Sequence, residues 1–399
     1  MLFPFNQNYF IHASSSPRFA LAVVVAGAFA VAPTQSWAAS TSNAFNPAVS
    51  VILNGTMARM DRDPASYTLP GFSLANEVGP GTQGFSLGES ELTFSANVDD
   101  QLYASLITTL TGDGSANVEE AAIETTSLGN GLTLRGGRFF SDIGYLNDQH
   151  AHVWYFVDMP LAYAGMLGNQ FNDDGVQARW LAPTDLFLEF GGEWFRGDHF
   201  PAGGAANKGK GAHSVFVHTG GDVGDSNSNS WRVGLSRLNT QSTDRASLSG
   251  ADSFSGHSNI TVLDAVWKWS PHGNATDRYL KLQGEYLHRD ENGTFNSNAY
   301  DGTQNGWYVQ GVYQFMPRWR AGIRHDTLHA DSVADDLVGT TLDSHGYDPK
   351  RNSVMVDFSN SEFSRVRLQF NRDQSSATTN NQWYLQYIAA IGAHGAHKY

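Results

Sequence analysis

The sequence predicts an all-β protein, a transmembrane antiparallel β-barrel of about 16 strands. The first observation is that apolar and polar residues alternate over segments of eight to twelve residues, separated by clusters of Gly, Asp, Asn and Ser. In "FSRVRLQFN", Val366, Leu368 and Phe370 share one face of an extended chain, while the charged and amide side chains share the other. This alternation is the pattern of strands with one apolar and one polar face.

Two further observations favour a membrane barrel over a soluble sandwich. Aromatic residues recur at the ends of the expected strands, where membrane barrels carry interfacial girdles. Examples are Trp231, Trp267, Trp269, Trp307, Phe315 and Trp383. The polar faces also carry full charges, as a wet lumen allows, and short connections alternate with long ones, as outer-membrane barrels show.

The periodicity places each strand between clusters of turn residues. The expected strands are 47–59, 86–98, 101–110, 117–127, 131–139, 171–182, 186–196, 212–220, 229–239, 258–270, 278–289, 305–316, 319–328, 351–359, 362–372 and 381–393. The expected long excursions between them are 60–85, 140–170, 197–211, 240–257, 290–304 and 329–350. Closing such a sheet removes its edges and satisfies the backbone inside lipid.

The first 39 residues have the pattern of a secretory signal peptide. Arg18 precedes the apolar run "FALAVVVAGAFAVA", which is too short to span a bilayer and is followed by a small-residue cleavage signature ending at Ala38 or Ala39. We therefore expect residues 1–39 to be a signal peptide and residues 40–399 to form the barrel. The chain contains no cysteine, which excludes a disulfide framework.

The net charge of −14 excludes a broadly basic surface for nucleic acid and favours cations over anions as guests. No nucleophile–base pattern, phosphate-binding glycine loop or metalloprotease motif appears, so we expect no enzymatic activity and no required cofactor.

The excursion after the fifth strand is too apolar and aromatic for a solvated loop. It reads "RFFSDIGYLNDQHAHVWYFVDMPLAYAGMLGNQ" over residues 138–170. An exposed run of this kind would be an aggregation hazard. We interpret it as a loop folded into the lumen, where it narrows the pore; packing against a neighbouring subunit and an error in the strand count are the alternatives.

Two histidine pairs are candidate metal ligands. His150 and His152 lie at i, i+2, which in extended backbone places both imidazoles on one side, and Asp148 could complete the site together with Asp158, Asp173 or Asp174. His394 and His397, in the terminal "GAHGAHKY", share a side only if the chain bends at Gly395. The alternative for all four is hydrogen bonding in a wet loop or at the rim.

The polar faces of the strands also provide pore-lining candidates that could set ion selectivity. They are Glu189, Glu193, Lys281, Glu285, Arg365 and Arg367. The alternative is that each only makes the inner wall hydrophilic and has no role in selectivity. In the last strand we expect a lipid-facing series of Trp383, Leu385, Tyr387, Ala389 and Ile391, with the strand ending near residue 393 and the tail turned aside.

Four segments resemble one group of Gram-negative outer-membrane proteins. They are "GFSLGESELTFSANVDD", "LRGGRFFSDIGYLNDQHAHVWYFVDMPLAY", "DDGVQARWLAP" and "GAHGAHKY". The group is described as zinc-regulated outer-membrane receptors and is distantly related to the phosphate-selective porins O and P. The resemblance implies a sixteen-stranded barrel that can form a homotrimer, a link to zinc acquisition, and a metal-related role for the four histidines. The plug and energy-coupling segment that a receptor would need are not visible in the sequence.

These observations together predict a Gram-negative outer-membrane porin for passive passage of small hydrophilic solutes. Zinc or another divalent metal is the favoured solute, transported or bound. The alternatives are a porin for anions or small organic nutrients, and a blocked structural or adhesive barrel with no metal role. The expected partners are outer-membrane lipid, lipopolysaccharide, the barrel-assembly machinery and further copies of the chain, but no nucleic acid.

Overall fold

The computed structural model describes residues 47–75, 78–112, 114–204, 209–224, 228–248 and 250–392. The expected signal peptide, His394 and His397 lie outside these residues. No helix in the described part of the chain is long and apolar enough to cross a membrane.

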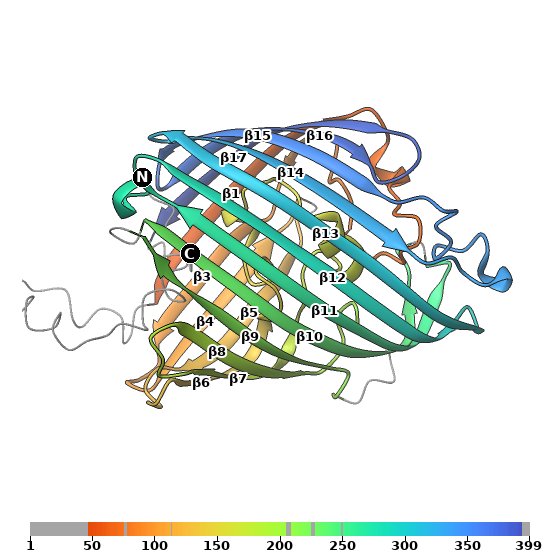
Figure 1. Cartoon of the computed structure of the whole chain (residues 1–399), viewed down its shortest axis with the longest axis horizontal. Coiled ribbons are helices and arrows are strands. Elements are labelled where there is room, and N and C mark those ends of the chain that lie inside the picture. The colour runs from red at the N-terminus through yellow and green to blue at the C-terminus, as the bar shows by residue number, and fades with distance from the viewer. Residues whose placement is uncertain are drawn as a thin grey trace, which may run out of the picture.

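The described chain forms one closed antiparallel sheet (Figure 1). Its strands are β1 (Ala48–Met60), β2 (Gly84–Leu87), β3 (Ser90–Asn97), β4 (Leu102–Leu110), β5 (Ala116–Thr125), β6 (Leu132–Phe140), β7 (Asn172–Leu181), β8 (Phe187–Phe195), β9 (Ala212–Val223), β10 (Asn229–Ala246), β11 (Ser253–Trp269), β12 (Tyr279–Phe295), β13 (Asn298–Met316), β14 (Trp319–Ala330), β15 (Lys350–Ser361), β16 (Ser364–Gln374) and β17 (Asn380–Gly392). Strands that are neighbours in sequence pair, except that β2 and β3 both pair with β1, and β1 also pairs with β17 to close the ring.

The barrel wall has sixteen positions, because β2 and β3 are two halves of one interrupted strand. Both pair with β1, β2 through residues 55–58 and β3 through residues 48–52. The interruption at Gly88 brings the chain against Asn54, so that a Cβ atom at this glycine would lie 2.7 Å from the Asn54 amide nitrogen. The predicted count of about 16 strands is confirmed.

The two faces of the wall have opposite polarity, as expected. In β17, Trp383, Leu385, Tyr387 and Ile391 are exposed on the outside, whereas Gln382 and Gln386 are buried inside the barrel. The exposed apolar belt is what lipid requires, and every strand finds hydrogen-bond partners within the ring. The chain is therefore an outer-membrane β-barrel.

Two predicted excursions, 240–257 and 290–304, are wrong, because most of these residues extend β10 to β13. The β12–β13 connection is only Asn296-Ser297, both with positive φ (51° and 70°), as a tight hairpin requires. The outward residues here, such as Gln241, Asp290 and Asn292, are polar. The hydrophobic alternation therefore stops while the backbone continues to pair above the apolar belt.

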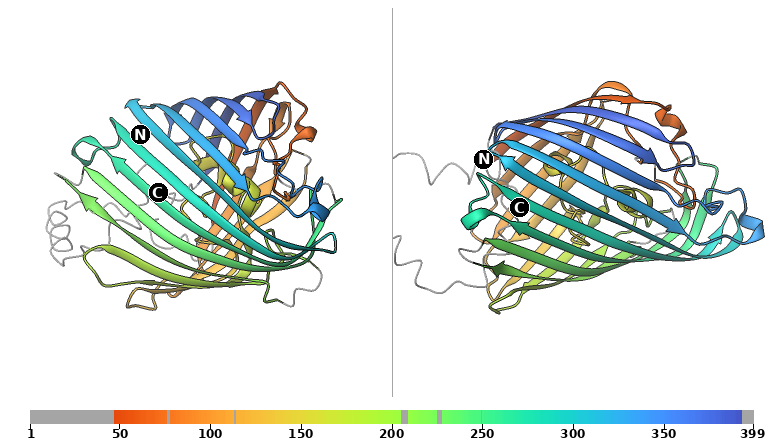
Figure 2. Two further views of the ribbon diagram at one scale, coloured as in Figure 1. Left: turned by 45° about the vertical axis from the view of Figure 1, so that its right-hand side comes forward. Right: turned by 45° about the horizontal axis from the view of Figure 1, so that its top comes forward.

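The interior of the barrel is filled by two long connections. Residues 141–171, here called the inner loop, fold into the lumen, and their helix α3 (Leu161–Leu167) is buried throughout (Figure 2). The helix packs against the inner faces of β12, β13 and β14. This confirms that the excursion after the fifth predicted strand enters the pore.

The excursion predicted at 60–85 corresponds to the connection 61–83 between β1 and β2, and its apolar part folds into the lumen. Leu69, Phe72 and Leu74 are buried in the same core as α3. A Cβ atom on Gly165 of α3 would meet the Phe72 ring at 3.0 Å, so a larger residue here would require the ring to shift. The two inward segments support one another and together narrow the lumen.

We predict that Phe72→Ala destabilises the barrel by about 3–5 kcal/mol, because it leaves a cavity between α3 and the wall. Urea unfolding of the protein in lipid micelles, followed by tryptophan fluorescence, measures this loss. Phe85→Ala is the control, because that ring is 85% exposed. An equal loss for both variants would contradict the packing described here.

Candidate functional site: the inner loop and the histidine–glutamate cluster

The carboxylate of Asp158 attaches the inner loop to the part of the barrel wall formed by β14, β15 and β16. It lies 2.9 Å from an Arg324 nitrogen and 2.7 Å from an Arg351 nitrogen, and it accepts hydrogen bonds from Gln369 and Asn371. Burial alone would raise the pKa of Asp158, but Arg351 and Arg324 hold it below its usual value. Asp158 is thus a charged anchor, committed to β14, β15 and β16.

Further wall side chains hold the backbone of the inner loop. Arg365 donates to the carbonyl oxygen of His152 at 2.6 Å, and Arg367 donates to that of Trp154 at 2.5 Å. Glu285 accepts from the backbone nitrogen of Tyr145 at 2.9 Å and from the Tyr163 hydroxyl at 2.7 Å. Each of these bonds replaces water at a buried polar group.

The structure places all six predicted pore-lining residues inside the barrel, where they are buried. Glu193 accepts from the Ser141 hydroxyl and the Asp142 backbone nitrogen, and Lys281 donates to the Tyr145 hydroxyl at 3.2 Å. Glu189 lies 3.3 Å from His218. Contact with the inner loop therefore accounts for Glu193, Lys281, Glu285, Arg365 and Arg367; a role in selectivity stays a prediction.

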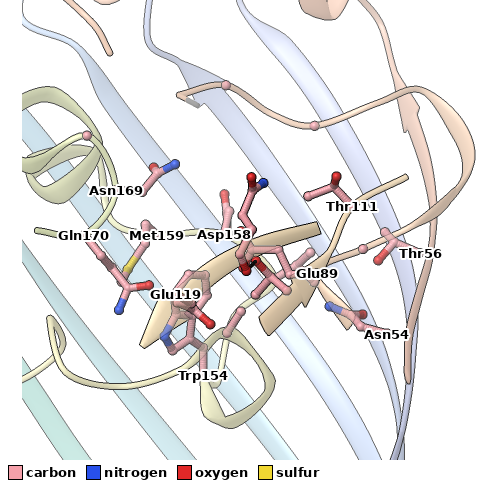
Figure 3. Close-up of a pocket in the computed structure, with 18 of the residues that line it drawn as sticks. Asn54, Thr56, Glu89, Thr111, Glu119, Trp154, Asp158, Met159, Asn169 and Gln170 are labelled. Atoms are coloured by element: carbon pink, nitrogen blue, oxygen red, sulfur yellow. Dashed lines mark hydrogen bonds between the residues drawn. The ribbon is translucent and has the colours of Figure 1, made fainter. Parts of the chain in front are cut away.

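A cavity of about 830 Å³ remains on the opposite side of the inner loop. Its lining comes from β1, β4, β5, β17, the 61–83 connection and the loop face that carries Trp154, Asn169 and Gln170 (Figure 3). Its acidic lining residues are Glu89, Glu119 and Asp158. Arg138, the one arginine among the described lining residues, is paired with Asp174 at 2.7 Å.

His150 and His152 flank Ala151, which lines this cavity, and they lie against three glutamates. His150 Nδ1 lies 3.3 Å from Glu119 Oε2, and His152 Nδ1 lies 2.6 Å from Glu91 Oε1. His150 Nε2 is 3.4 Å from Glu120 Oε1. We call these five residues the histidine–glutamate cluster.

A β-bulge explains how two consecutive glutamates both face inward. In the pairing of β4 with β5, Ile107 opposes Glu120 and Thr108 opposes Val118, so that Glu119 is the extra residue. Bulges of this kind change the direction of a side chain beside functional sites. Glu91 reaches the same place from β3 by ordinary alternation.

The charges of the cluster partly compensate one another. Burial opposes the charged imidazolium, but the carboxylates of Glu119 and Glu91 hold the pKa of His150 well above its usual value. Arg135 pairs with Glu120 from the neighbouring strand β6. Buried carboxylates at this density require such counter-charges.

The structure brings together some of the predicted metal ligands and separates others. His150 and His152 have stacked rings with centroids 5.9 Å apart, although the backbone between them is a 3₁₀ turn (Ala151–Val153) and not an extended strand. Among the described residues, the group with metal-ligand spacing is Glu91, Glu119 and His150, and it does not include Asp148.

The other aspartates proposed from sequence proximity are engaged elsewhere. Asp158 pairs with Arg324 and Arg351, Asp173 accepts from the backbone of Gly197 and Asp198, and Asp174 pairs with Arg138. Glu91, Glu119 and Glu120 were not among the predicted ligands, because they lie 30 to 61 residues away from the histidines. For Glu91 and Glu120 the available signal was their position on the polar faces of the expected strands 86–98 and 117–127; Glu119 faces inward only because of the bulge.

The comparison with curated proteins identifies a relative. An uncharacterized protein of Aquifex aeolicus (strain VF5) is 30% identical over 408 residues, which cover 94% of this chain and 83% of that protein. The chain belongs to one family with this Aquifex protein. No family model matches the chain.

Solved structures with the same fold are outer-membrane proteins. OmpT of Vibrio cholerae in its trimer form has a TM-score of 0.54 and 12% identity, with 87% of this chain and 99% of that chain covered. An anion-selective porin from Comamonas acidovorans has the same TM-score, identity and coverage. At this identity the likeness shows the fold alone, which is a porin-type barrel.

We predict that Asp158→Ala releases the inner loop, because it leaves Arg324 and Arg351 without this carboxylate. Breaking a buried ion pair in this way costs about 3–5 kcal/mol. Chymotrypsin should then cleave the loop at its aromatic residues in the folded barrel. Asp185→Ala, in an exposed turn, is the control and should leave the loop resistant; resistance of both variants would show that Asp158 is not the anchor.

Proposed function

We propose that the chain is a passive outer-membrane porin for small hydrophilic solutes, and that it prefers cations. The cavity between the inner loop and the β1–β5 side of the wall supplies the path. One observation carries the preference: the acidic residues Glu89, Glu119 and Asp158 line the cavity, and Asp158 is paired with Arg324 and Arg351. The arginine of the lining, Arg138, is paired with Asp174.

The arginines of the opposite wall do not counter this preference. Arg324 and Arg351 are paired with Asp158, and Arg365 and Arg367 donate to loop carbonyl groups. They lie behind the inner loop and are not part of the cavity lining. This distribution favours a cation porin over the anion selectivity stated for the Comamonas protein.

Zinc or another divalent metal is the solute that we propose for this path. The support is chemical, since imidazole and carboxylate groups are the donors that such ions prefer, and the histidine–glutamate cluster offers both at the cavity edge. The resemblance to zinc-regulated outer-membrane proteins points in the same direction. We further propose assembly as a homotrimer, as in the trimer form of OmpT.

Ion selectivity in planar bilayers tests this proposal. We predict a reversal potential of cation-selective sign in a potassium chloride gradient, and a smaller one for Glu89→Gln/Glu119→Gln. Each lost charge changes the free energy of a monovalent ion by about 0.4 kcal/mol at about 10 Å in water, so the cation-to-anion permeability ratio falls several-fold.

Glu362→Gln is the matched control, because this glutamate is exposed in the turn between β15 and β16, away from the cavity. It should leave the reversal potential unchanged. An anion-selective wild type would refute the cation preference, and a wild type without conductance would refute the porin function.

A further inference from the structure

Three elements each bring one ligand atom to a single point of the histidine–glutamate cluster. Glu91 comes from β3, Glu119 from the bulge in β5 and His150 from the inner loop, and their ligand atoms lie within 4.8 Å of one another. His150 Nδ1 is 3.3 Å from Glu119 Oε2 and 3.7 Å from Glu91 Oε2. Tetrahedral zinc with bonds of about 2.0–2.2 Å needs neighbouring ligand atoms about 3.3–3.6 Å apart. Small side-chain rotations are therefore enough to enclose an ion.

The groups around these three atoms have the arrangement that orients metal ligands. The other ring nitrogen of His150 faces the carboxylate of Glu120, which is itself held by Arg135. His152 contacts the second oxygen of Glu91 at 2.6 Å. Carboxylates that hold the distal nitrogen of a ligating histidine fix its tautomer and its direction.

The donor set selects the class of ion. One imidazole and two carboxylates suit zinc and similar transition metals, whereas calcium and magnesium prefer oxygen donors in larger number. Three protein ligands leave a fourth position for water, and Glu119 also lines the cavity. An ion can therefore reach the site from the proposed path and leave it again, as conduction requires.

We propose that Glu91, Glu119 and His150 bind a divalent transition metal of the zinc type, and that the bound ion ties the inner loop to the β3–β5 wall and reduces conductance. Without the ion, Asp158, Arg365 and Arg367 hold one side of the loop. The β3–β5 side is then held by the histidine–glutamate contacts alone, and the bound ion adds metal–ligand bonds to them. The effect on conductance rests on the proposed porin function, whereas metal binding does not.

Isothermal titration of zinc into the purified, chelator-treated protein in detergent tests the binding. We expect His150→Gln and Glu119→Gln each to weaken one zinc site at least about tenfold, the effect that even an outer-sphere partner has. His257→Gln is the control, because this exposed histidine of β11 lies outside the cluster. Heat-modifiable mobility in gels checks that each variant is folded. Isotherms identical to wild type for both folded cluster variants would overturn the site.

Potassium conductance in planar bilayers tests the link between loop and wall. We expect micromolar zinc to lower the wild-type current, a chelator to restore it, and His150→Gln to be insensitive. Zinc binding without any change in current would overturn the loop-tying role. A wild type that binds zinc but carries no current would refute the porin function and leave the metal site standing.

Discussion

The arrangement of the lumen depends on one interaction, the ion pairs of Asp158 with Arg324 and Arg351. Arginines on the inner face of a barrel must be solvated or paired, because an unpaired buried charge is costly. Asp326 of β14 pairs with both arginines from the wall itself, and the inner loop adds the second carboxylate, Asp158. Carbonyl groups of the loop also accept hydrogen bonds from Arg365 and Arg367. The basic wall therefore draws the loop to one side, and this decides where open space remains.

The side chains of β1 to β5, on the other side of the inner loop, determine the chemistry of the open space. The chain from β1 to β5 presents Asn54, Thr56, Thr109, Glu89 and Glu119 to the cavity, so this side of it is polar and acidic. In the porin that we propose, acidic groups therefore lie along the path, while several arginines hold the loop. A pore can in this way combine an arginine-rich interior with an acidic lining.

The barrel could be predicted because strand periodicity is a local property. The lipid-facing series from Trp383 to Ile391, the strand count and the entry of the inner loop into the lumen all follow from residue type and spacing. Two features were beyond local patterns. The upper parts of β10 to β13 are paired without an apolar face, and the connection 61–83 turns inward through only a few apolar residues such as Phe72.

The candidate metal site shows the same division. His150 and His152 stand out as neighbours in the sequence, but their partners come from β3 and β5 and meet them only through the closure of the barrel and the bulge at Glu119. Proximity in sequence wrongly suggested Asp158, Asp173 and Asp174, which the fold gives to arginines and backbone groups. Strand register decides which carboxylates share a site, and the register of each strand depends on how all the strands of the barrel pair.

Cysteine accessibility tests the position of the path most directly, because the chain has no cysteine of its own. Thr56→Cys places a thiol in the cavity, and Ser353→Cys places one on β15, where the side chain is buried on the inner face of the arginine-rich wall. A charged, water-soluble thiol reagent should reduce the current through the first variant and leave the second unchanged. Block of Ser353→Cys with no effect on Thr56→Cys would place the path on the other side of the loop and contradict this account.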